Sequence, residues 1–406
     1  MFIFSSTIPK KEGNIGVAVQ KMTKPNHSET LRLFKKPQKS YFLFGPRGSG
    51  KSTWLRMTYP DGVLIDLLDS EVYRQLRAYP ERLREIVSGK QGIPIVLDEI
   101  QKVPELLSMV HLLIEAGYGP FILTGSSARK LKRTGVDLLA GRAQLFRMHP
   151  FVASELLHFD FEFHLKFGFL PLIVSSLDPI NDLRTYLALY MKEEVLLEGL
   201  IRRIDPFARF LEVVSFSQGS LINASEIARD CHVSAKTVET YLTILEDLLL
   251  CFRLPIFAKK AKRILVSHAK FYYFDVGIYR QIRPKGPLDR PEKIDGIGIE
   301  TMVAQHLRAW IDYSEFNNDL FFWRTKSGLE VDFVVYGESG ITAIEVKNAA
   351  TLRDSDLRGL HEFLKDYPMA KAILVYRGKL RLQKGQVICE PIASFLKMNL
   401  SQLMQA

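Results

Sequence analysis

The sequence predicts an α/β fold: a parallel sheet in the first half, then a helical segment, a helix-turn-helix unit and a second α/β unit. Three observations support this prediction. From Ser40 to Pro150, short apolar runs alternate with helical stretches, the pattern of strands joined by crossover helices. Two amphipathic helices follow, separated by a short polar turn. Near Pro287 a second alternation of helices and strands begins.

The composition is that of a globular protein with an excess of basic residues. The chain has 406 residues, enough for two or three folded units at about 150 residues each. No apolar run reaches the roughly 18 residues of a membrane-spanning helix. There is no secretory signal pattern, and three scattered cysteines make no disulfide framework, so we expect a cytoplasmic protein without a membrane partner. The net charge of +10 favours a nucleic-acid partner, although a generic basic protein explains it equally well.

The first motif is a glycine-rich loop between the apolar run YFLF and a predicted helix. It reads GPRGSGKS and matches G-x-x-x-x-G-K-[ST]. In such a loop, backbone N–H groups surround the phosphates of a nucleotide. Lys51 would add a positive charge there, and the Ser52 hydroxyl would ligate Mg²⁺. We expect ATP to be bound by Gly45, Pro46, Arg47, Gly48, Ser49, Gly50, Lys51, Ser52 and Thr53.

A second motif places two carboxylates after the apolar run that ends at Leu97. We expect Asp98 to hold the magnesium ion through water, and Glu99 to polarise the attacking water as the base of a hydrolase. The alternative is a strand that ends in a solvated acidic turn, and the preceding glycine-rich loop favours the catalytic interpretation. Ser126 ends the strand that begins at Phe121, and we expect it to orient water beside the γ-phosphate.

Arg142 lies in a glycine-containing turn between two apolar runs, in the sequence LLAGRAQLF. An exposed arginine at this position could reach the γ-phosphate of a neighbouring subunit and act as an arginine finger. A plain surface arginine explains the same pattern equally well, and Arg129 is a competing candidate for the role.

The segments GPRGSGKST, LDEIQKVP, LTGSSARKL and LAGR, in this order, resemble the AAA+ ATPases, in particular a large set of predicted prokaryotic ATPases. The resemblance implies a P-loop NTPase domain of the AAA+ type that uses ATP and Mg²⁺. AAA+ ATPases commonly work as rings or other oligomers, which implies a homo-oligomer and would give an Arg142 finger its meaning. Members of that set also carry a C-terminal domain of unknown function that joins a winged helix to a restriction-endonuclease-like core. The last part of this chain is similar to it.

The middle of the chain has the pattern of a winged helix-turn-helix. The helices ASEIARDC and AKTVETYLTILEDLLLCF are separated by the turn HVS, and a β-rich segment follows. Basic side chains at the start of the second helix and in the wing would contact DNA phosphates. We assign this contact to Lys236, Lys259, Lys260, Lys262 and Arg263. The second helix is also acidic at Glu239, Glu246 and Asp247, so a winged helix that packs between domains is the alternative.

The last unit carries the spacing D…ExK. Asp332 lies in the predicted strand EVDFVV, and Glu345 and Lys347 share one face of the next strand. Two carboxylates can hold a divalent ion there while the ammonium activates water, and Glu300 on the preceding helix could support the metal. This set resembles the PD-(D/E)XK nuclease superfamily, with Val331 in place of the proline. A fold that has lost cleavage and a plain surface ion pair are the alternatives.

These patterns predict six consecutive parts. They are a loose leader at 1–36, a P-loop ATPase domain at 37–150, a helical lid or linker at 151–205, a winged helix-turn-helix at 206–285, a nuclease-like domain at 286–395 and a tail at 396–406. The predicted function is magnesium-dependent ATP hydrolysis coupled to action on DNA. Two other functions stay open: a nucleotide-switched scaffold or regulator with a silent nuclease-like domain, and a metal-dependent DNase that uses ATP only for gating.

Overall fold

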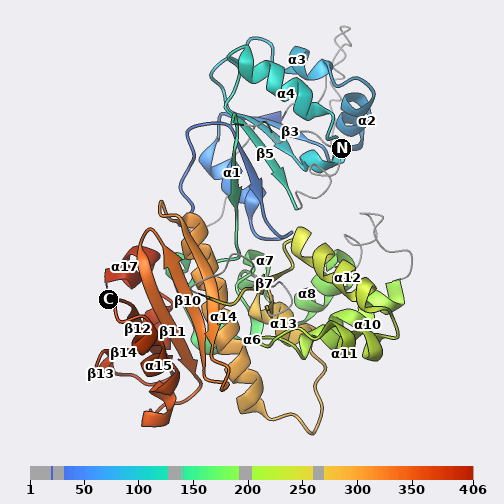
Figure 1. The fold of residues 1–406 in the computed structure, drawn as a ribbon. Helices are drawn as coiled ribbons and strands as arrows, with labels where there is room; N and C mark the ends of the chain where they lie inside the picture. Colours follow the sequence, from blue (N-terminus) through green and yellow to red (C-terminus); the bar gives the residue numbers. More distant parts are fainter. Residues whose placement is uncertain are drawn as a thin grey trace, which may run out of the picture.

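The computed structural model describes residues 20–21, 32–126, 139, 141–191, 204–258 and 269–405. These residues form two six-stranded sheets and one two-stranded sheet. In Figure 1 the first large sheet and its helices make up the upper part of the molecule. The second large sheet lies below it, beside a group of shorter helices, and the long helix α14 runs between them. No helix in the described part of the chain is long and apolar enough to cross a bilayer.

The first sheet has the strand order β1-β3-β4-β5-β2-β6, and all of its strands except β1 are parallel. The strands are β1 (Gln20–Lys21), β2 (Tyr41–Phe44), β3 (Val63–Asp66), β4 (Ile95–Asp98), β5 (Phe121–Gly125) and β6 (Gln144–Arg147). The helices are α1 (Lys51–Thr58), α2 (Ser70–Ala78), α3 (Arg82–Ile86) and α4 (Leu106–Glu115). Strands β2, β4 and β5 are buried throughout, which explains their continuous apolar sequences. Their carboxyl ends meet at one edge of the sheet.

The residues before β2 are not entirely the loose leader that their composition predicts. Gln20–Lys21 pair with β3, and Phe34 is buried against Trp54 and Phe146. The N–H of Leu33 donates to the Glu155 carboxylate at 2.6 Å. These contacts join residues distant in the sequence, so local composition gives no sign of them.

The segment in which a helical lid or linker is expected contains short helical elements. They are α6 (Phe161–Phe167), α7 (Pro171–Val174), α8 (Pro179–Thr185) and a π-helical turn at Tyr186–Met191. The start of this segment forms only a 3₁₀ turn at Ala153–Glu155, where the buried Glu155 carboxylate accepts from the N–H groups of Val152 and Leu33. The segment does not form a bundle of its own: Phe169 joins the core of the second large sheet, and Tyr186 joins that of the next helices.

The next unit begins with three helices, α10 (Ile204–Ser215), α11 (Ala224–Cys231) and α12 (Ala235–Asp247). His232 adopts a left-handed conformation (φ 53°) between α11 and α12, and the Ser234 hydroxyl caps α12 by accepting from the Thr237 N–H. The antiparallel strands β7 (Cys251–Leu254) and β8 (Lys270–Tyr273) and the helix α13 (Val276–Ile282) follow.

The last unit starts with the long helix α14 (Pro291–Tyr313) and contains a sheet of order β13-β14-β12-β11-β10-β9. Strands β9 (Asn318–Arg324), β10 (Glu330–Gly337) and β11 (Gly340–Lys347) are antiparallel, while β12 (Lys371–Tyr376) and β14 (Val387–Pro391) run parallel to β11. The short strand β13 is Leu382–Lys384.

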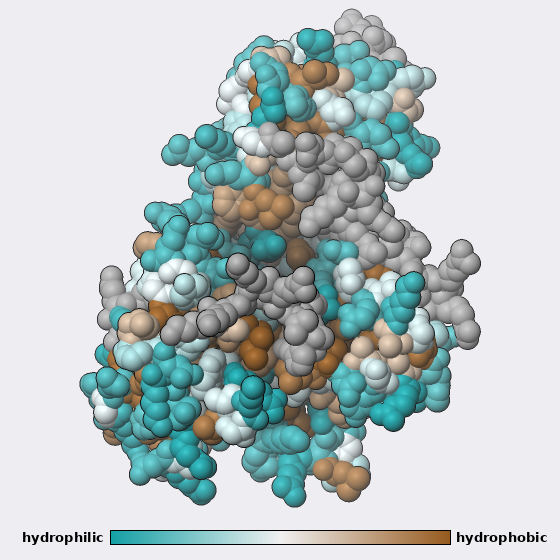
Figure 2. Space-filling model, in the orientation of Figure 1, coloured by the Kyte–Doolittle hydropathy of each residue, from teal (hydrophilic) through white to brown (hydrophobic). Residues whose placement is uncertain are grey.

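Two layers of helices cover this second sheet. Helix α14 packs on one face and α15 (Arg358–Asp366) on the other. After α16 (Ile392–Phe395) the chain ends in α17 (Leu400–Gln405), whose Leu400 and Leu403 are buried in the core with α14. The expected tail is therefore part of the fold, because its two leucines bury apolar surface. The face of the molecule in Figure 2 is mostly hydrophilic.

Candidate nucleotide and metal sites

The glycine-rich loop follows β2 and leads into the amino terminus of α1. Gly48 (φ 77°) and Gly50 (φ 89°) adopt left-handed conformations that other residues rarely take. A Cβ at Gly45 would lie 2.4 Å from the Met148 carbonyl oxygen, so only glycine fits there. The Lys51 ammonium donates to the carbonyl oxygens of Gly45 at 2.6 Å and Pro46 at 3.2 Å. The loop and the positive end of the α1 dipole are suited to an anion such as a nucleotide phosphate.

Ser52 and Asp98 meet beside this loop. The Ser52 hydroxyl donates to Asp98 Oδ2 at 3.1 Å, and the Thr124 hydroxyl donates to Asp98 Oδ1. A hydroxyl on α1 and a carboxylate at the end of β4 are therefore within reach of one small cation. Mg²⁺ is usually held by one or two carboxylates together with waters and phosphate oxygens, so this pair of oxygen ligands fits the ion.

Glu99 lies next to this pair in a left-handed backbone conformation (φ 61°, ψ 47°), which is costly for a residue with a side chain. Its N–H donates to the Thr124 hydroxyl at 3.3 Å. Its carboxylate accepts a hydrogen bond from Gln101 Nε2, and that same nitrogen lies 3.3 Å from Ser126 Oγ. Gln101 thus connects the expected base to the expected water-orienting serine.

Gln101 is a site residue that sequence reasoning missed. It is buried, and the 3₁₀ turn Ile100–Lys102 brings its side chain back toward the end of β5. A Cβ at Gly125 would lie 2.4 Å from Gln101 Oε1, so glycine at that position leaves room for the amide. The only sign in the sequence is a glutamine two residues after the acidic motif, which does not reveal the direction of its side chain.

The short helices after β6 touch the glycine-rich loop directly. The Tyr186 hydroxyl donates to the Arg47 carbonyl oxygen at 2.9 Å. A Cβ at Gly48 would lie 3.5 Å from the Tyr186 ring, and one at Gly50 would lie 3.4 Å from Pro171. The glycine-rich loop is therefore in direct contact with α7 and with the π-helical turn.

Arg142 lies at the edge of the first sheet formed by the amino ends of its strands, opposite the edge that carries the glycine-rich loop. It precedes β6, whose first residue, Gln144, pairs with Tyr41 at the amino end of β2. Because β2 has four residues, about 13 Å of strand separates this edge from the glycine-rich loop. Arg142 Nε forms an ion pair with Glu115 at 2.5 Å, and it is remote from the nucleotide loop of its own chain. The competing candidate Arg129 lies outside the described residues.

The structure brings together the three residues of the D…ExK pattern. Asp332 on β10 lies beside Glu345 on the antiparallel strand β11. Asp332 Oδ2 accepts from the Val346 N–H at 2.8 Å, and the Lys347 ammonium donates to Glu345 Oε1 at 2.5 Å. Within the described part of the chain, the buried Glu345 Oε2 has no hydrogen-bond partner. An unpartnered carboxylate oxygen beside a second carboxylate fits a cation ligand.

Glu300 is engaged differently from the metal-supporting role expected of it. Its carboxylate accepts from the Tyr272 hydroxyl at 2.5 Å and from the Lys270 ammonium at 3.4 Å. Lys270 also pairs with Glu330 and lies 3.7 Å from Asp332 Oδ1. Its side chain is only 3% exposed, so β8 of the preceding unit contributes a buried cation to this cluster. No signal in the sequence links Lys270 to carboxylates 30 and more residues away.

The cluster carries more negative than positive groups. Four carboxylates, Glu300, Glu330, Asp332 and Glu345, face three cations: Lys270, Lys347 and the more exposed Arg324, which lies 3.8 Å from Glu330. Burial and the charge of Asp332 raise the pKa of Glu345 to about 8. Burial raises the pKa of Glu300 to about 7 against the charge of Lys270. A cation bound beside Asp332 and Glu345 would offset the remaining negative charge.

Asp332, Glu345 and Glu300 are the carboxylates that the sequence assigned to this metal site. Within the described ranges, no three His, Cys, Asp or Glu side chains are arranged around one point as a metal site. Asp332 and Glu345 are the pair whose placement fits a divalent ion. Lys270 and Tyr272 both bind Oε1 of Glu300, so a supporting role of Glu300 stays a prediction.

Of the five residues assigned to DNA contact, the structure describes one. Lys236 is exposed at the start of α12, whereas Lys259, Lys260, Lys262 and Arg263 lie outside the described residues. Two acidic residues of α12 that argued against DNA contact are paired within the protein. Arg253 on β7 binds Glu239 at 3.0 Å and Glu246 at 2.6 Å.

Three family models match consecutive parts of the chain. Residues 37–157 match an AAA domain, residues 158–289 match a Domain of unknown function (DUF8612), and residues 295–395 match a Domain of unknown function (DUF4143). Each model covers less than half of the chain, and together they cover most of it.

The chain is also similar to whole proteins. Uncharacterized proteins of Mycobacterium tuberculosis and Mycobacterium bovis are 26% identical over 355 residues, covering 85% of this chain and 78% of theirs. An uncharacterized protein of Haemophilus influenzae is 24% identical over 312 residues, covering 68% of this chain and 77% of its own.

Two solved structures show only weak likeness. The Aeropyrum pernix Orc1 protein in complex with DNA has a TM-score of 0.25 at 15% identity, over 59% of this chain and 84% of its own. A Vibrio cholerae protein has a TM-score of 0.21 at 11% identity, over 90% and 97%. The matched models and the parallel sheet around the glycine-rich loop identify an AAA-type ATPase domain joined to a C-terminal domain of unknown function.

Proposed function

We propose that this protein is a magnesium-dependent ATPase whose nucleotide state controls a DNA-directed C-terminal half. The observation that carries the proposal is the meeting of Lys51, Ser52 and Asp98 at one edge of the parallel sheet, with Glu99 beside them. A phosphate-binding loop, a magnesium ligand pair and a base are the parts that hydrolysis of a nucleoside triphosphate requires.

In this mechanism the loop N–H groups and Lys51 bind the β- and γ-phosphates. Ser52 and Asp98 would hold Mg²⁺, which neutralises charge on the phosphate oxygens when bound. Glu99 orients the attacking water and accepts its proton, while Gln101 fixes the Glu99 carboxylate relative to Ser126.

Two contacts support a route from the nucleotide to the rest of the molecule. Tyr186 binds the loop itself through the Arg47 carbonyl. At the end of β6, His149 Nε2 and Arg147 both bind Asp312 on α14, at 2.6 Å and 3.6 Å. Helix α14 also carries Glu300, so it spans from the ATPase sheet to the acidic cluster. A change in the loop would be transmitted along these elements.

For the C-terminal half we propose a winged helix and a PD-(D/E)XK-like core. The order of helices and strands around β7 and β8, the pairing of Asp332 with Glu345, and the neighbouring Lys347 support this assignment. Asp332 and Glu345 would hold a divalent ion. Lys236 and the basic segment from Lys259 to Arg263 would contact DNA phosphates, in line with the net charge of +10.

The test is steady-state ATP hydrolysis by the full chain in Mg²⁺, with and without double- and single-stranded DNA, beside the variant Glu99→Gln. A DNA-stimulated rate that the variant lacks is expected. Hydrolysis at the same rate in wild type and Glu99→Gln would overturn the assignment of the catalytic site. An ATPase rate indifferent to DNA would leave the catalytic site standing and remove the DNA coupling.

A second function, that of a nucleotide-switched scaffold, is favoured by one observation. The buried Lys270 ammonium lies among three of the four carboxylates of the C-terminal cluster and neutralises part of their charge. A scaffold would turn over ATP slowly and would cleave no DNA in Mg²⁺ or Mn²⁺. Cleavage that Asp332→Ala abolishes would exclude it, and cleavage that also survives Glu99→Gln would indicate a DNase that uses ATP only for gating.

A further inference from the structure

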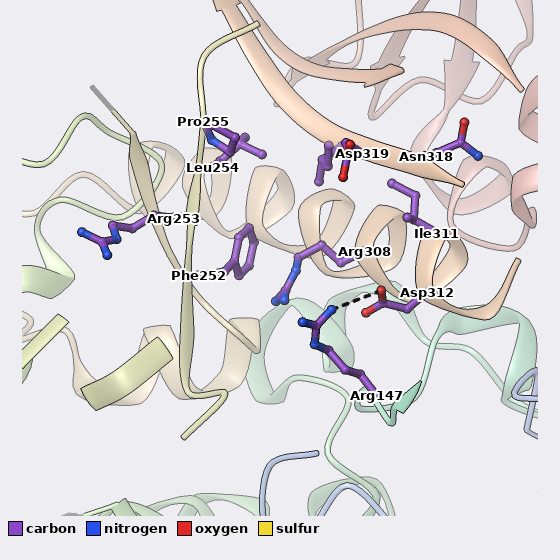
Figure 3. Close-up of a pocket in the computed structure, with 11 residues that line it drawn as sticks. Arg147, Phe252, Arg253, Leu254, Pro255, Arg308, Ile311, Asp312, Asn318 and Asp319 are labelled. Atoms are coloured by element: carbon purple, nitrogen blue, oxygen red, sulfur yellow. Dashed lines mark ion pairs between the residues drawn. The ribbon is translucent and has the colours of Figure 1, made fainter. Parts of the chain in front are cut away.

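A pocket of about 210 Å³ lies where three parts of the chain meet (Figure 3). Arg147 at the end of β6 comes from the ATPase sheet, Phe252 and Arg253 come from β7, and Arg308 and Asp312 come from α14. Neither the nucleotide loop nor the acidic cluster contributes to its walls. The pocket is therefore separate from both candidate sites.

Arg308 is a half-buried cation without a hydrogen-bonded counter-charge. Its guanidinium lies over the Phe252 ring, 4.0 Å from the ring centre, and within the described residues it makes no hydrogen bond or ion pair. Burial lowers the pKa of Arg308 to about 10, the charge of Arg147 adds to this effect, and Asp312 opposes it. A guanidinium stacked on an aromatic ring keeps its N–H donors available at the ring edge.

One carboxylate of the lining, Asp312, is paired with Arg147 and with His149. Arg147 lies 3.6 Å from Asp312 Oδ1, and Asp312 Oδ2 is already bonded to His149 at 2.6 Å. Burial lowers the pKa of His149, which favours its neutral form. Arg253 is bound by Glu239 and Glu246. The remaining acid of the lining, Asp319, is exposed, so water screens its charge. Arg147, itself exposed, and Arg308 thus face one carboxylate, Asp312, so positive charge exceeds negative charge between the two arginines.

We propose that this pocket binds a phosphoryl group between Arg147 and Arg308. Guanidinium groups bind phosphate oxygens through paired, charge-assisted hydrogen bonds, and an anion here would relieve the repulsion between the two arginines. The volume is below the roughly 300 Å³ at which drug-sized sites begin, so one phosphate group fits rather than a whole nucleotide. A backbone phosphate of nucleic acid and a free phosphate share this chemistry. The proposal does not depend on ATP hydrolysis.

The bound group would compete with Asp312 for Arg147. Because Asp312 also holds His149 at the end of β6, the ligand would alter the contact between the ATPase sheet and α14. Binding of an anion in this pocket would therefore change how the ATPase sheet contacts α14.

The test uses the full chain carrying Lys51→Ala, so that the nucleotide loop does not bind the probe. Binding of inorganic phosphate is measured by calorimetry, with chloride added to keep ionic strength constant. We expect saturable binding that Arg308→Met weakens at least ten-fold. Arg358→Met, the same change on α15 across the sheet, is the control and should bind phosphate as the parent does.

The exposed Arg147 gives a second variant should Arg308→Met fail to fold, and Arg147→Met is also expected to weaken phosphate binding. The proposal is overturned if phosphate binds the parent no better than chloride does, or if Arg308→Met or Arg147→Met binds phosphate as the parent does.

A salt series with short single- and double-stranded DNA then identifies the source of the phosphate group. A slope of log affinity against log salt that falls by about one in Arg308→Met indicates a nucleic-acid phosphate. An unchanged slope, with weakened phosphate binding, indicates a free phosphate.

Discussion

Glu99 is positioned by its neighbours as well as by its motif. Its backbone is left-handed, and Gln101 binds its carboxylate. We expect Glu99→Gln to lower kcat by about 10²- to 10⁴-fold, because the amide cannot accept the proton of the attacking water. Gln101→Leu, which keeps the bulk but removes the amide, should lower kcat less, by about ten-fold. Steady-state turnover checks both variants. The Kd of ATP should stay near that of wild type, and unchanged turnover in Gln101→Leu would show that the amide does not position Glu99.

Lys270 is a single residue on which a whole charge cluster depends. Lys270→Met leaves Glu300, Glu330 and Asp332 without their shared cation, and removing one partner of a buried ion pair costs about 3–5 kcal/mol. We expect a loss of this size in the free energy of unfolding, measured with urea at pH 7.5. The loss should shrink at pH 6, because protonated carboxyls need no counter-charge.

Two control variants show whether the loss of stability in Lys270→Met comes from the missing buried charge. The exposed Lys365→Met should change stability by less than about 0.5 kcal/mol. The double variant Lys270→Met/Glu330→Gln should regain part of the lost stability, since it removes one of the acids that pair with Lys270. If Lys270→Met were as stable as Lys365→Met, the buried cation would contribute nothing to the cluster.

At the scale of elements, α14 is joined to the segment after β6 through a neutral histidine. His306 Nε2 accepts from the Ala153 N–H at 2.9 Å, so its proton is on Nδ1, which donates to the Met302 carbonyl at 2.7 Å. Burial lowers the pKa of His306 to about 3. The unfolded chain binds this proton near pH 6.5 and the folded chain only near pH 3, so stability is lost as pH falls through that window.

The expected size follows from one proton per molecule, at about 1.4 kcal/mol per pH unit. Between pH 6.5 and pH 5, wild type should lose about 2 kcal/mol more stability than His306→Gln, whose side chain does not titrate. Urea unfolding followed by tryptophan fluorescence at the two pH values gives the comparison. Parallel pH profiles in the two proteins would contradict the neutral, buried state of His306.

The elements differ in how far the sequence predicts them. Strands β2, β4 and β5 are short apolar runs beside glycine-rich or acidic motifs, so their positions follow from local pattern. The alternation in β10 and β11 likewise places Asp332 beside Glu345. The burial of Phe34 and Leu403, the return of Gln101 to Ser126 and the entry of Lys270 into the acidic cluster depend on tertiary contacts. No local pattern specifies them.

At the scale of the whole molecule, the position of Arg142 sets a requirement for assembly. It lies at the amino edge of the first sheet, paired with Glu115, whereas the nucleotide loop lies at the carboxyl edge. If Arg142 acts on a γ-phosphate, that phosphate belongs to a neighbouring chain. The ATPase would then depend on protein concentration, and each active site would combine residues of two chains.

A mixing experiment tests this arrangement. Lys51→Ala keeps Arg142 but lacks a working nucleotide loop, while Arg142→Ala keeps the loop but lacks the arginine, so each variant alone should hydrolyse ATP at least ten-fold more slowly than wild type. Mixed in equal amounts, they should regain activity, because Lys51→Ala chains supply arginines to intact loops of Arg142→Ala chains. Lys51→Ala/Arg142→Ala mixed with Arg142→Ala supplies no arginine and serves as the control. Full turnover by Arg142→Ala alone would make Arg142 a surface residue held by Glu115, and its ion pair a local contact.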